Sequence, residues 1–575
     1  MTNNNPREGM DNQLMHEMRR IEAAQAVLKR KGLDLLDQMR TEDDVAGYQS
    51  VLALWQNEGF LAEVEATVLA ELEPDPGGIR CFLADFETQI EDLDARWLLA
   101  LWWQASGTRV VDFQALIGEY QSVYTEDLLQ RLESMQQTPD VDSVTQRRLN
   151  VWQQAAEREL VDSVLVSQRT GLRQDIASYR FHHQSRDYTA SQIPTLILRE
   201  EQNRELRRKA WNSLAQLSQQ MAPKMRKLLL QTNAYWQEKG YVNANAPRLQ
   251  ALGVSESVVR QAVTNCEQAS RSAAQELISA YKNLLGHELE PWDWRFAAGQ
   301  MVRPFERAFE DIDAINITKQ TYENLGIMID QLPIQIMESS TTYQTKRYCV
   351  RIPHDIIFSY GPLSGYRKPF VLIRDLGKAC SFTHIDEALP YPFRRYAPEV
   401  LLEGLGTLAS WVLWEPDWLQ EYTDLTANQV EKFVRQMKGY ELLKTRHYAC
   451  LALFELDAYA ILAEDTDADL MGLYKQYMEQ FLLLPQYKPS IWAAEPRLIL
   501  HFPYLSQYVL SLAVAANLLD YFQRRGMALF SPHFGDLLRS NLVQLGNASS
   551  WVERLQQLTA RSIAPFPMSW STMQT

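Results

Sequence analysis

Apolar side chains recur at helical spacing along nearly the whole chain. In Met225–Trp236 and Leu442–Leu462 they return every three or four positions, which is the repeat of one face of an α-helix. A different pattern occupies Tyr348–Ile352, where large apolar side chains alternate with other residues and predict a short strand. We therefore expect a mainly α protein with a few short strands.

Charged residues interrupt one apolar helical segment near the middle of the chain. Pro369–Phe382 contains Arg374, Asp375 and Lys378 among mostly apolar neighbours. Because Arg374 and Lys378 are four positions apart, they project from the same helical face. Gly377 lies within the predicted helix, where it costs about 1 kcal/mol relative to alanine, so we expect another group to approach the backbone there.

A second predicted helix, Pro398–Trp414, carries the carboxylate of Glu403. Glu403 shares a face with the small residues Gly406, Thr407 and Ser410, and such a stripe lets a helix pack closely against a neighbour. Taken alone, the charges on these two helices also fit polar residues spread over ordinary amphipathic helices. The pattern singles out four charged positions and leaves their role open.

The length of the chain allows more than one domain. At 575 residues it is several times a typical domain of roughly 100–150 residues, so it has room for a large core or two lobes. Residues 1–105 are predicted to form several helices, which act as a cap or belong to the same domain as the rest. Residues 106–575 are predicted to form the main helical domain.

Composition excludes several classes of partner. The formal net charge of -15 argues against nucleic acid, since proteins that bind it concentrate Lys and Arg on one face. No run of about 18 apolar residues indicates a membrane span. Five scattered cysteines without C-x-x-C spacing indicate reduced thiols, and the polar segment Met1–Arg20 lacks the apolar core of a secretory signal. We expect a cytoplasmic protein whose oligomeric state stays open.

The residues around Glu403 resemble those of the gluzincin zinc peptidases. Leu389–Ala397, Glu403–Gly406 and Pro416–Leu419 are similar to segments that surround the third zinc ligand in the angiotensin-converting-enzyme family. The same region is similar to the oligoendopeptidase F and thimet-oligopeptidase family, and the choice between the two stays open. Glu403 follows Arg374 by 29 positions (403 − 374), and this interval resembles that between the His-Glu-x-x-His helix and the glutamate ligand of gluzincins.

Further passages extend the resemblance over about residues 110–575. Pro291–Arg295 and Tyr348–Ile356 are similar to the start of the catalytic half and to the cleft-edge strand of the oligopeptidases. His501, Tyr504 and Tyr508 are similar to a segment that stabilises an oxyanion and holds substrate in those families. The resemblance implies a large two-lobed helical peptidase-like fold with a central cleft, and it places these three side chains on the cleft wall.

The zinc-binding motif itself is missing. In gluzincins two histidines one helical turn apart and a glutamate hold the zinc, and a further glutamate accepts a proton from the bound water. The resemblance puts Arg374 and Lys378 at the histidine positions, Asp375 at the position of the base and Glu403 at that of the glutamate ligand. Arginine and protonated lysine do not ligate zinc. We expect no metal, and instead a cluster in which two cations face two carboxylates.

The sequence therefore predicts a catalytically inactive metallopeptidase homologue. It is expected to need no cofactor and to bind a peptide or a partner protein in its cleft. The expected binding residues are His501, Tyr504, Tyr508, Arg394 and Arg395.

Two alternatives stay open. One is an active zinc-dependent oligopeptidase with unconventional ligands such as Glu403, Asp375 and either His384 or His501. The other is a helical scaffold with a closed cleft, whose outer faces or first hundred residues recruit partners. Metal content and peptide cleavage distinguish the first alternative from an inactive protein, and peptide binding distinguishes the second.

Overall fold

The computed structural model describes residues 78–183, 185–339, 345–484, 487–495, 505–527 and 531–563. The chain divides into two compact units, residues 1–83 and 84–575, and nearly all of the described residues belong to the second. Residues 1–77 lie outside the described ranges. The predicted role of residues 1–105 as a cap or as part of the main domain therefore stays a prediction.

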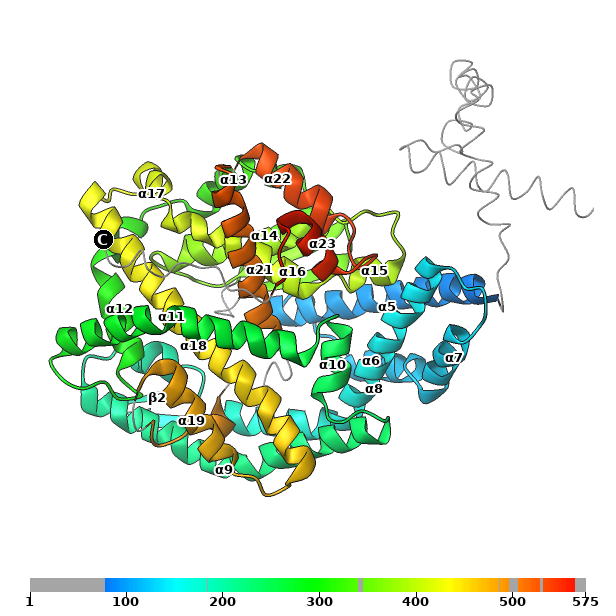
Figure 1. Ribbon diagram of the computed structural model, residues 1–575, viewed down its shortest axis with the longest axis horizontal. Helices are drawn as coiled ribbons and strands as arrows, with labels where there is room; N and C mark the ends of the chain where they lie inside the picture. Colours follow the sequence, from blue (N-terminus) through cyan, green and yellow to red (C-terminus); the bar gives the residue numbers. More distant parts are fainter. Residues whose placement is uncertain are drawn as a thin grey trace, which may run out of the picture. The chain divides into compact units, whose positions relative to one another are not determined.

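Helices dominate the described part of the second unit, which confirms the prediction of a mainly α fold (Figure 1). The helices of 28 residues or more are α5 Ile79–Ser106, α8 Ser143–Ser178, α9 Arg204–Glu238, α11 Glu256–Leu285 and α18 Ala427–Glu464. The shorter ones include α6 Phe113–Val123, α7 Glu126–Gln136, α10 Asn245–Ala251, α12 Trp294–Val302, α13 Ala314–Glu323, α14 Arg367–Thr383, α15 Tyr391–Arg395, α16 Glu399–Ser410, α17 Pro416–Tyr422, α19 Leu470–Leu482, α21 Leu505–Arg524, α22 Pro532–Leu538 and α23 Trp551–Thr559.

Helix α18 packs against several other helices of the described unit. It begins with a capping box, in which Thr426 and Gln429 satisfy each other's backbone N–H groups, and it packs against α9, α11, α19 and α21 (Figure 1). Its fully buried Arg446 donates from Nη2 to Oε1 of Glu267 in α11 at 2.9 Å and from Nε to the carbonyl oxygen of Phe481 in α19 at 2.6 Å. A buried arginine with such partners fixes the relative positions of three helices.

Two small sheets complete the described unit. Strands β1 Arg180–His183 and β2 Arg186–Thr189 form an antiparallel pair. The other sheet has the order β3-β5-β4, with β3 Ile334–Glu338 parallel and β4 Lys346–Arg351 antiparallel to β5 Asp355–Tyr360. Strand β4 confirms the strand predicted from the alternating pattern at 348–352.

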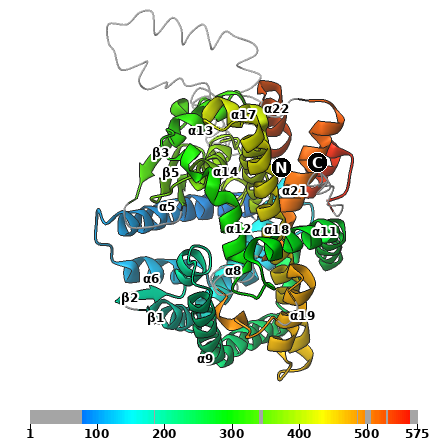
Figure 2. The same cartoon turned by 90° about the vertical axis from the view of Figure 1, so that its left-hand side faces the viewer.

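The sheet β3-β5-β4 is covered by helices on its two faces. Tyr348, Val350 and Ile357 pack against Ala95 and Trp102 of α5. Figure 2 shows β3 and β5 beside α5 and α14. The alternation of side chains along β4 thus separates a face toward α5 from a face toward the main core.

Helix α16 lies between α14 and α21 and is buried on every side. Apart from Glu399, all of its residues are buried. Two glycines make the close packing possible: a Cβ on Gly406 would lie 2.6 Å from the carbonyl oxygen of Arg374 in α14, and a Cβ on Gly404 would lie 2.7 Å from the side chain of Val514 in α21. The small-residue stripe around Glu403 therefore brings its carboxylate directly against α14.

The predicted helix 398–414 is divided in the structure. The α-helical part ends at Ser410, and Trp411–Trp414 form a 3₁₀ turn. In a 3₁₀ helix, side chains three positions apart lie over one another, and the Trp411 and Trp414 rings stack with centroids 4.8 Å apart. The change of helix type thus aligns two large aromatic side chains at the end of the buried segment.

The sequence predicts no membrane span and reduced cysteines, and the described residues bear on both predictions. None of their helices combines the length and the apolar character needed to cross a membrane. Cys266, Cys349, Cys380 and Cys450 are buried thiols, and Cys81 is exposed.

Candidate functional site

The four charged positions singled out from the sequence meet at the contact of α14 with α16. Nη2 of Arg374 donates to Oε2 of Glu403 at 3.0 Å, and Nζ of Lys378 donates to Oε1 of the same carboxylate at 2.7 Å. Nζ of Lys378 also lies 2.8 Å from Oδ1 of Asp375. Both carboxylate oxygens of Glu403 are therefore engaged by cations. We call Arg374, Asp375, Lys378 and Glu403 the ion-pair cluster.

Both carboxylates of the ion-pair cluster are held in the ionised form. Burial raises the pKa of Asp375, but the positive charges of Lys378 and Arg374 outweigh burial and lower the pKa to about 2. The hydroxyl of Thr345 also donates to Oδ2 of Asp375. Burial likewise raises the pKa of Glu403, and the same two cations reverse this effect and give a net decrease. The cluster is thus charge-compensated at neutral pH.

Aromatic and charged groups from α18 and α21 surround Arg374. The Cζ atom of Arg374 lies 5.6 Å from the ring centroid of Tyr508, and the Tyr508 and Tyr448 rings are 3.9 Å apart. Lys444 pairs with Glu441 at 2.9 Å. Burial raises the pKa of the Tyr508 hydroxyl, but the charges of Arg374 and Lys444 lower it, with a net decrease. The predicted binding residue Tyr508 is thus part of the surroundings of the cluster.

Gly377 confirms that another group approaches the α14 backbone. A Cβ at this position would lie 1.7 Å from the Tyr322 hydroxyl oxygen. That hydroxyl donates to the carbonyl oxygen of Ile373 at 2.7 Å. Glycine is therefore required by the packing of α13 against α14.

The residues at the expected zinc position do not fit a divalent cation. A zinc site needs histidine, cysteine or carboxylate ligands with free lone pairs. Here the side chains of Arg374 and Lys378 are cations, and they occupy both oxygens of Glu403. Among the described residues, no group of three or more His, Cys, Asp or Glu side chains is placed to hold a metal ion.

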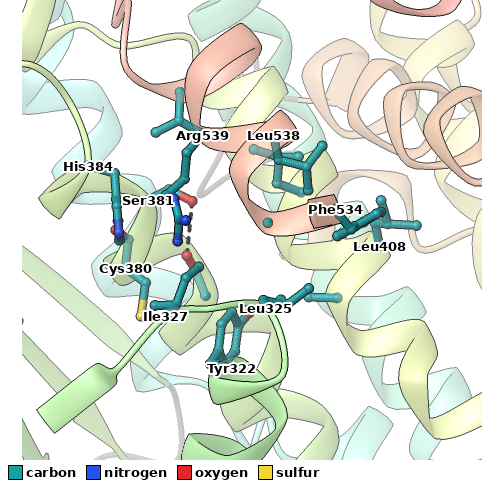
Figure 3. Close-up of a pocket in the computed structure, with 15 residues that line it drawn as sticks. Tyr322, Leu325, Ile327, Cys380, Ser381, His384, Leu408, Phe534, Leu538 and Arg539 are labelled. Carbon is teal, nitrogen blue, oxygen red and sulfur yellow. Dashed lines mark hydrogen bonds between the residues drawn. The ribbon is translucent and has the colours of Figure 1, made fainter. Parts of the chain in front are cut away.

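His384, an alternative zinc ligand, faces a different pocket. It lines a cavity of about 50 Å³ together with Tyr322, Cys380 and Arg539 (Figure 3). Its Nδ1 atom lies 2.7 Å from the carbonyl oxygen of Cys380, and burial lowers its pKa. The structure therefore places His384 beside a cationic arginine and not in the ion-pair cluster.

The two predicted binding arginines have different surroundings. All three guanidinium nitrogens of Arg394 donate to protein acceptors, namely the carbonyl oxygens of Leu389 and Ile352 and the carboxylate of Glu91. Arg395 pairs with Asp94 at 2.9 Å. Arg394 is thus committed to holding α15 in place, whereas Arg395 also lines a cavity, described next. His501 and Tyr504 lie outside the described residues.

A cavity of about 560 Å³ lies beside the start of α16, and we call it the α8–α10 cavity. Ligand pockets typically have volumes of about 300–1,000 Å³, so this one can hold a small ligand or a short peptide segment. Its wall includes α8, α9, α10, the segment 395–400 that leads into α16, and Gln507, which precedes Tyr508. The cavity therefore lies next to the first turn of α16, the helix that carries Glu403.

The wall of the α8–α10 cavity mixes apolar and charged side chains. Trp236, Trp551 and Val400 contribute apolar surface. The charged side chains that line it are Glu157, Arg158, Asp162, Arg169, Arg248, Arg395 and Glu399. A surface of this kind suits a ligand that has both apolar and polar groups.

Sequence reasoning missed Thr345, the Lys444–Glu441 pair and the arginines of the α8–α10 cavity. Arg158 and Arg248 are 90 positions apart (248 − 158) and lie on different helices. No local pattern connects two such residues, and each resembles a solvent-facing arginine of an amphipathic helix. Only the tertiary arrangement reveals that they share a wall.

The fold resembles that of a solved peptidase structure. The M32 carboxypeptidase from Deinococcus radiodurans R1 is similar over 86% of this chain and 98% of its own, with a TM-score of 0.58 and 14% sequence identity. This similarity supports the peptidase-like fold expected from the sequence, and at such low identity it concerns the fold alone. No family model matches the chain, and no curated protein sequence matches it.

Proposed function

We propose that this protein is a catalytically inactive homologue of the metallopeptidases that binds a peptide, free or as a segment of a partner protein, in the α8–α10 cavity. The observation that carries the proposal is the ion-pair cluster. Lys378 and Arg374 hold both oxygens of Glu403 at 2.7 and 3.0 Å, at the position where the sequence resemblance expects a zinc ligand. A carboxylate bound in this way has no free oxygen for a metal.

The ion-pair cluster also removes the chemistry of such a site. Metallopeptidases cleave peptides with a water molecule that the metal activates. Asp375, at the position of the base, is engaged by Lys378 and Thr345, so its oxygens already accept hydrogen bonds from the protein. What remains is a peptidase-like fold with a cavity of suitable size, which supports binding without cleavage.

A mixed peptide library tests this proposal. The purified protein is incubated with the library, with and without added zinc and with a chelator, and mass spectrometry identifies retained and cleaved peptides. We expect retained peptides, no cleavage products and no effect of zinc. Cleavage that the chelator abolishes would establish the active-peptidase alternative, and a failure to retain any peptide would favour the scaffold.

A cavity-filling substitution tests where the peptide binds. Ala251 is exposed at the end of α10 and lines the cavity, so Ala251→Trp fills part of it without entering the core. Ala427→Trp, at an exposed position at the start of α18 away from the cavity wall, is the matched control. Only Ala251→Trp is expected to abolish peptide retention, and equal retention by both variants would place the peptide elsewhere.

A further inference from the structure

Among the charged residues of the α8–α10 cavity, Arg158 has N–H donors that are available to a ligand. It lies on α8, lines the cavity and keeps 55% of its side-chain surface exposed. Its nearest acidic contact is Oε1 of Glu159 at 3.4 Å, longer than the roughly 2.7–2.9 Å of a strong charge-assisted hydrogen bond. Cζ of Arg158 also lies 5.2 Å from the Tyr396 ring centroid. Most of the five N–H donors of this guanidinium remain available.

The other charged side chains of the wall have partners within the protein. The ion pairs are Arg169 with Asp162, Arg395 with Asp94, and Glu399 with Arg347. Glu157 accepts a hydrogen bond from Gln153 at 3.0 Å, and burial raises its pKa, which favours its neutral form. Among the arginines of the described wall, Arg158 therefore has the longest ion-pair contact, 3.4 Å to Glu159.

Arg248 lies on the same wall, but its donors are directed into the protein. Its Nη1 donates to Oε2 of Glu455 at 3.0 Å, but its Nη2 is buried without a hydrogen-bond partner. Buried unsatisfied donors are uncommon in folded proteins, because each costs about 1–3 kcal/mol. Because this Nη2 atom has almost no accessible surface, it does not face the cavity, and the available donors of the wall are those of Arg158.

We propose that the α8–α10 cavity recognises an acidic ligand, a peptide rich in Asp or Glu, and that the guanidinium of Arg158 binds one of its carboxylates. This inference rests on the proposed function, since it names the class of peptide that is bound. Arginine binds carboxylates through two parallel N–H donors in a planar fork that matches the two carboxylate oxygens. Trp236 and Trp551 offer apolar surface to the methylene groups of the ligand.

Fluorescence anisotropy of a labelled pentaglutamate, with labelled pentaglutamine as the uncharged counterpart, tests the inference. The full-length protein is compared with Arg158→Gln, Arg158→Lys and Arg173→Gln. Arg173 is an exposed arginine on the same helix that does not line the cavity, so its substitution is matched in charge change. Unlabelled glutarate serves as a small dicarboxylate competitor.

We expect pentaglutamate to bind at least about tenfold more tightly than pentaglutamine, and Arg158→Gln to lose about that factor. Arg158→Lys should retain part of the affinity, and Arg173→Gln should change it by less than about twofold. Ala251→Trp, which fills part of the cavity without altering Arg158, should abolish binding and gives an independent check should Arg158→Gln fold poorly.

Equal binding of the two peptides, or equal effects of Arg158→Gln and Arg173→Gln, would overturn the inference. Should library peptides still be retained in that case, the proposed function stands and only the acidic specificity fails. Arg158-dependent binding of glutarate without binding of pentaglutamate would overturn the peptide assignment and identify a small dicarboxylate as the ligand. If neither the library nor pentaglutamate binds, the proposed function and the inference both fail.

Discussion

The ion-pair cluster and the α8–α10 cavity both contain arginines, but the distance from arginine to the nearest carboxylate differs between them. In the cluster, Arg374 and Lys378 face Asp375 and Glu403, and each carboxylate is in direct contact with a cation. In the cavity, the closest carboxylate to Arg158 is only loosely held at 3.4 Å. The cations of the cluster contact carboxylates at 2.7–3.0 Å, whereas Arg158 has only the 3.4 Å contact. The proposal of a peptidase-like fold that binds a peptide without cleaving it rests on this contrast.

The largest effect is expected when the cluster loses the carboxylate that both cations share. Glu403→Ala leaves Arg374 and Lys378 largely buried with only Asp375 as a counter-charge, and breaking a buried ion pair costs about 3–5 kcal/mol. The free energy of unfolding in urea measures this cost. Glu431→Ala in α18 is the control, because Glu431 and its partner Arg435 are 66% and 41% exposed, and such a surface pair should contribute about 1 kcal/mol or less. Equal losses in the two variants would mean that the cluster is not a stabilising unit.

A smaller loss is expected when the two helices are pushed apart. In Gly406→Ala the new Cβ would meet the carbonyl oxygen of Arg374 at 2.6 Å and the Lys378 side chain at 2.9 Å. Overpacking of this kind costs about 1–3 kcal/mol in unfolding free energy. Gly118→Ala in α6, where no atom lies within 4 Å, should instead be neutral or stabilise by up to about 1 kcal/mol. Unchanged stability of Gly406→Ala would show that the helix contact is looser than described.

The acid dependence of stability isolates the contribution of Asp375. Its pKa in the folded protein is about 2, below the value of about 3.9 in an unfolded chain. The folded state therefore favours the ionised form, so the stabilisation is present above about pH 4 and is lost as the pH falls toward 2. The difference in unfolding free energy between the wild-type protein and Asp375→Asn should shrink by roughly 2 kcal/mol over this range. Urea unfolding at several pH values measures this difference, and Asp424→Asn, at an exposed position, is the control. If the unfolding free energies of the wild-type protein and Asp375→Asn fell in parallel with pH, the acid dependence would not come from Asp375.

The smallest effect on stability is expected in the cavity. Arg158→Gln removes a cation whose ring contact with Tyr396 contributes about 1 kcal/mol or less at an exposed position. Thermal and urea unfolding should therefore change little, although binding of an acidic peptide weakens. A loss as large as that of Glu403→Ala would mean that Arg158 has a structural role and would remove the contrast between the two regions.

The cluster can be predicted from the sequence much better than the cavity, because the cluster depends on local helical spacing and the cavity on contacts between distant segments. Helical spacing places Arg374 and Lys378 on one face, and the small residues around Glu403 indicate a close helix contact, so the cluster follows from two neighbouring segments. The strand β4 follows from alternation in the same way. The α8–α10 cavity is formed by segments more than 300 residues apart, from Val151 to Trp551, and no local pattern encodes such a juxtaposition.

Some details of the predicted elements also depend on tertiary packing. The helix predicted for 398–414 changes to a 3₁₀ turn at Trp411, where the stacking of Trp411 on Trp414 is favoured over a continued α-helix. The guanidinium of Arg394, a predicted binding residue, donates to the carbonyl oxygens of Leu389 and Ile352 and to the carboxylate of Glu91. A surface-like arginine in the sequence gives no sign of such carbonyl acceptors, because their positions depend on the packing of α5 and α15.

Zinc binding tests the central claim, that two cations occupy the place of a metal at Glu403. Isothermal titration with zinc at neutral pH compares the wild-type protein with a variant that combines Arg374→His, Asp375→Glu and Lys378→His and keeps Glu403. Two imidazoles one turn apart and a carboxylate form a zinc ligand set, so the variant should bind one zinc ion, whereas the wild-type protein should bind none at this position. Stoichiometric zinc on the wild-type protein that Glu403→Ala removes, or no gain of zinc by the combined variant, would contradict the account.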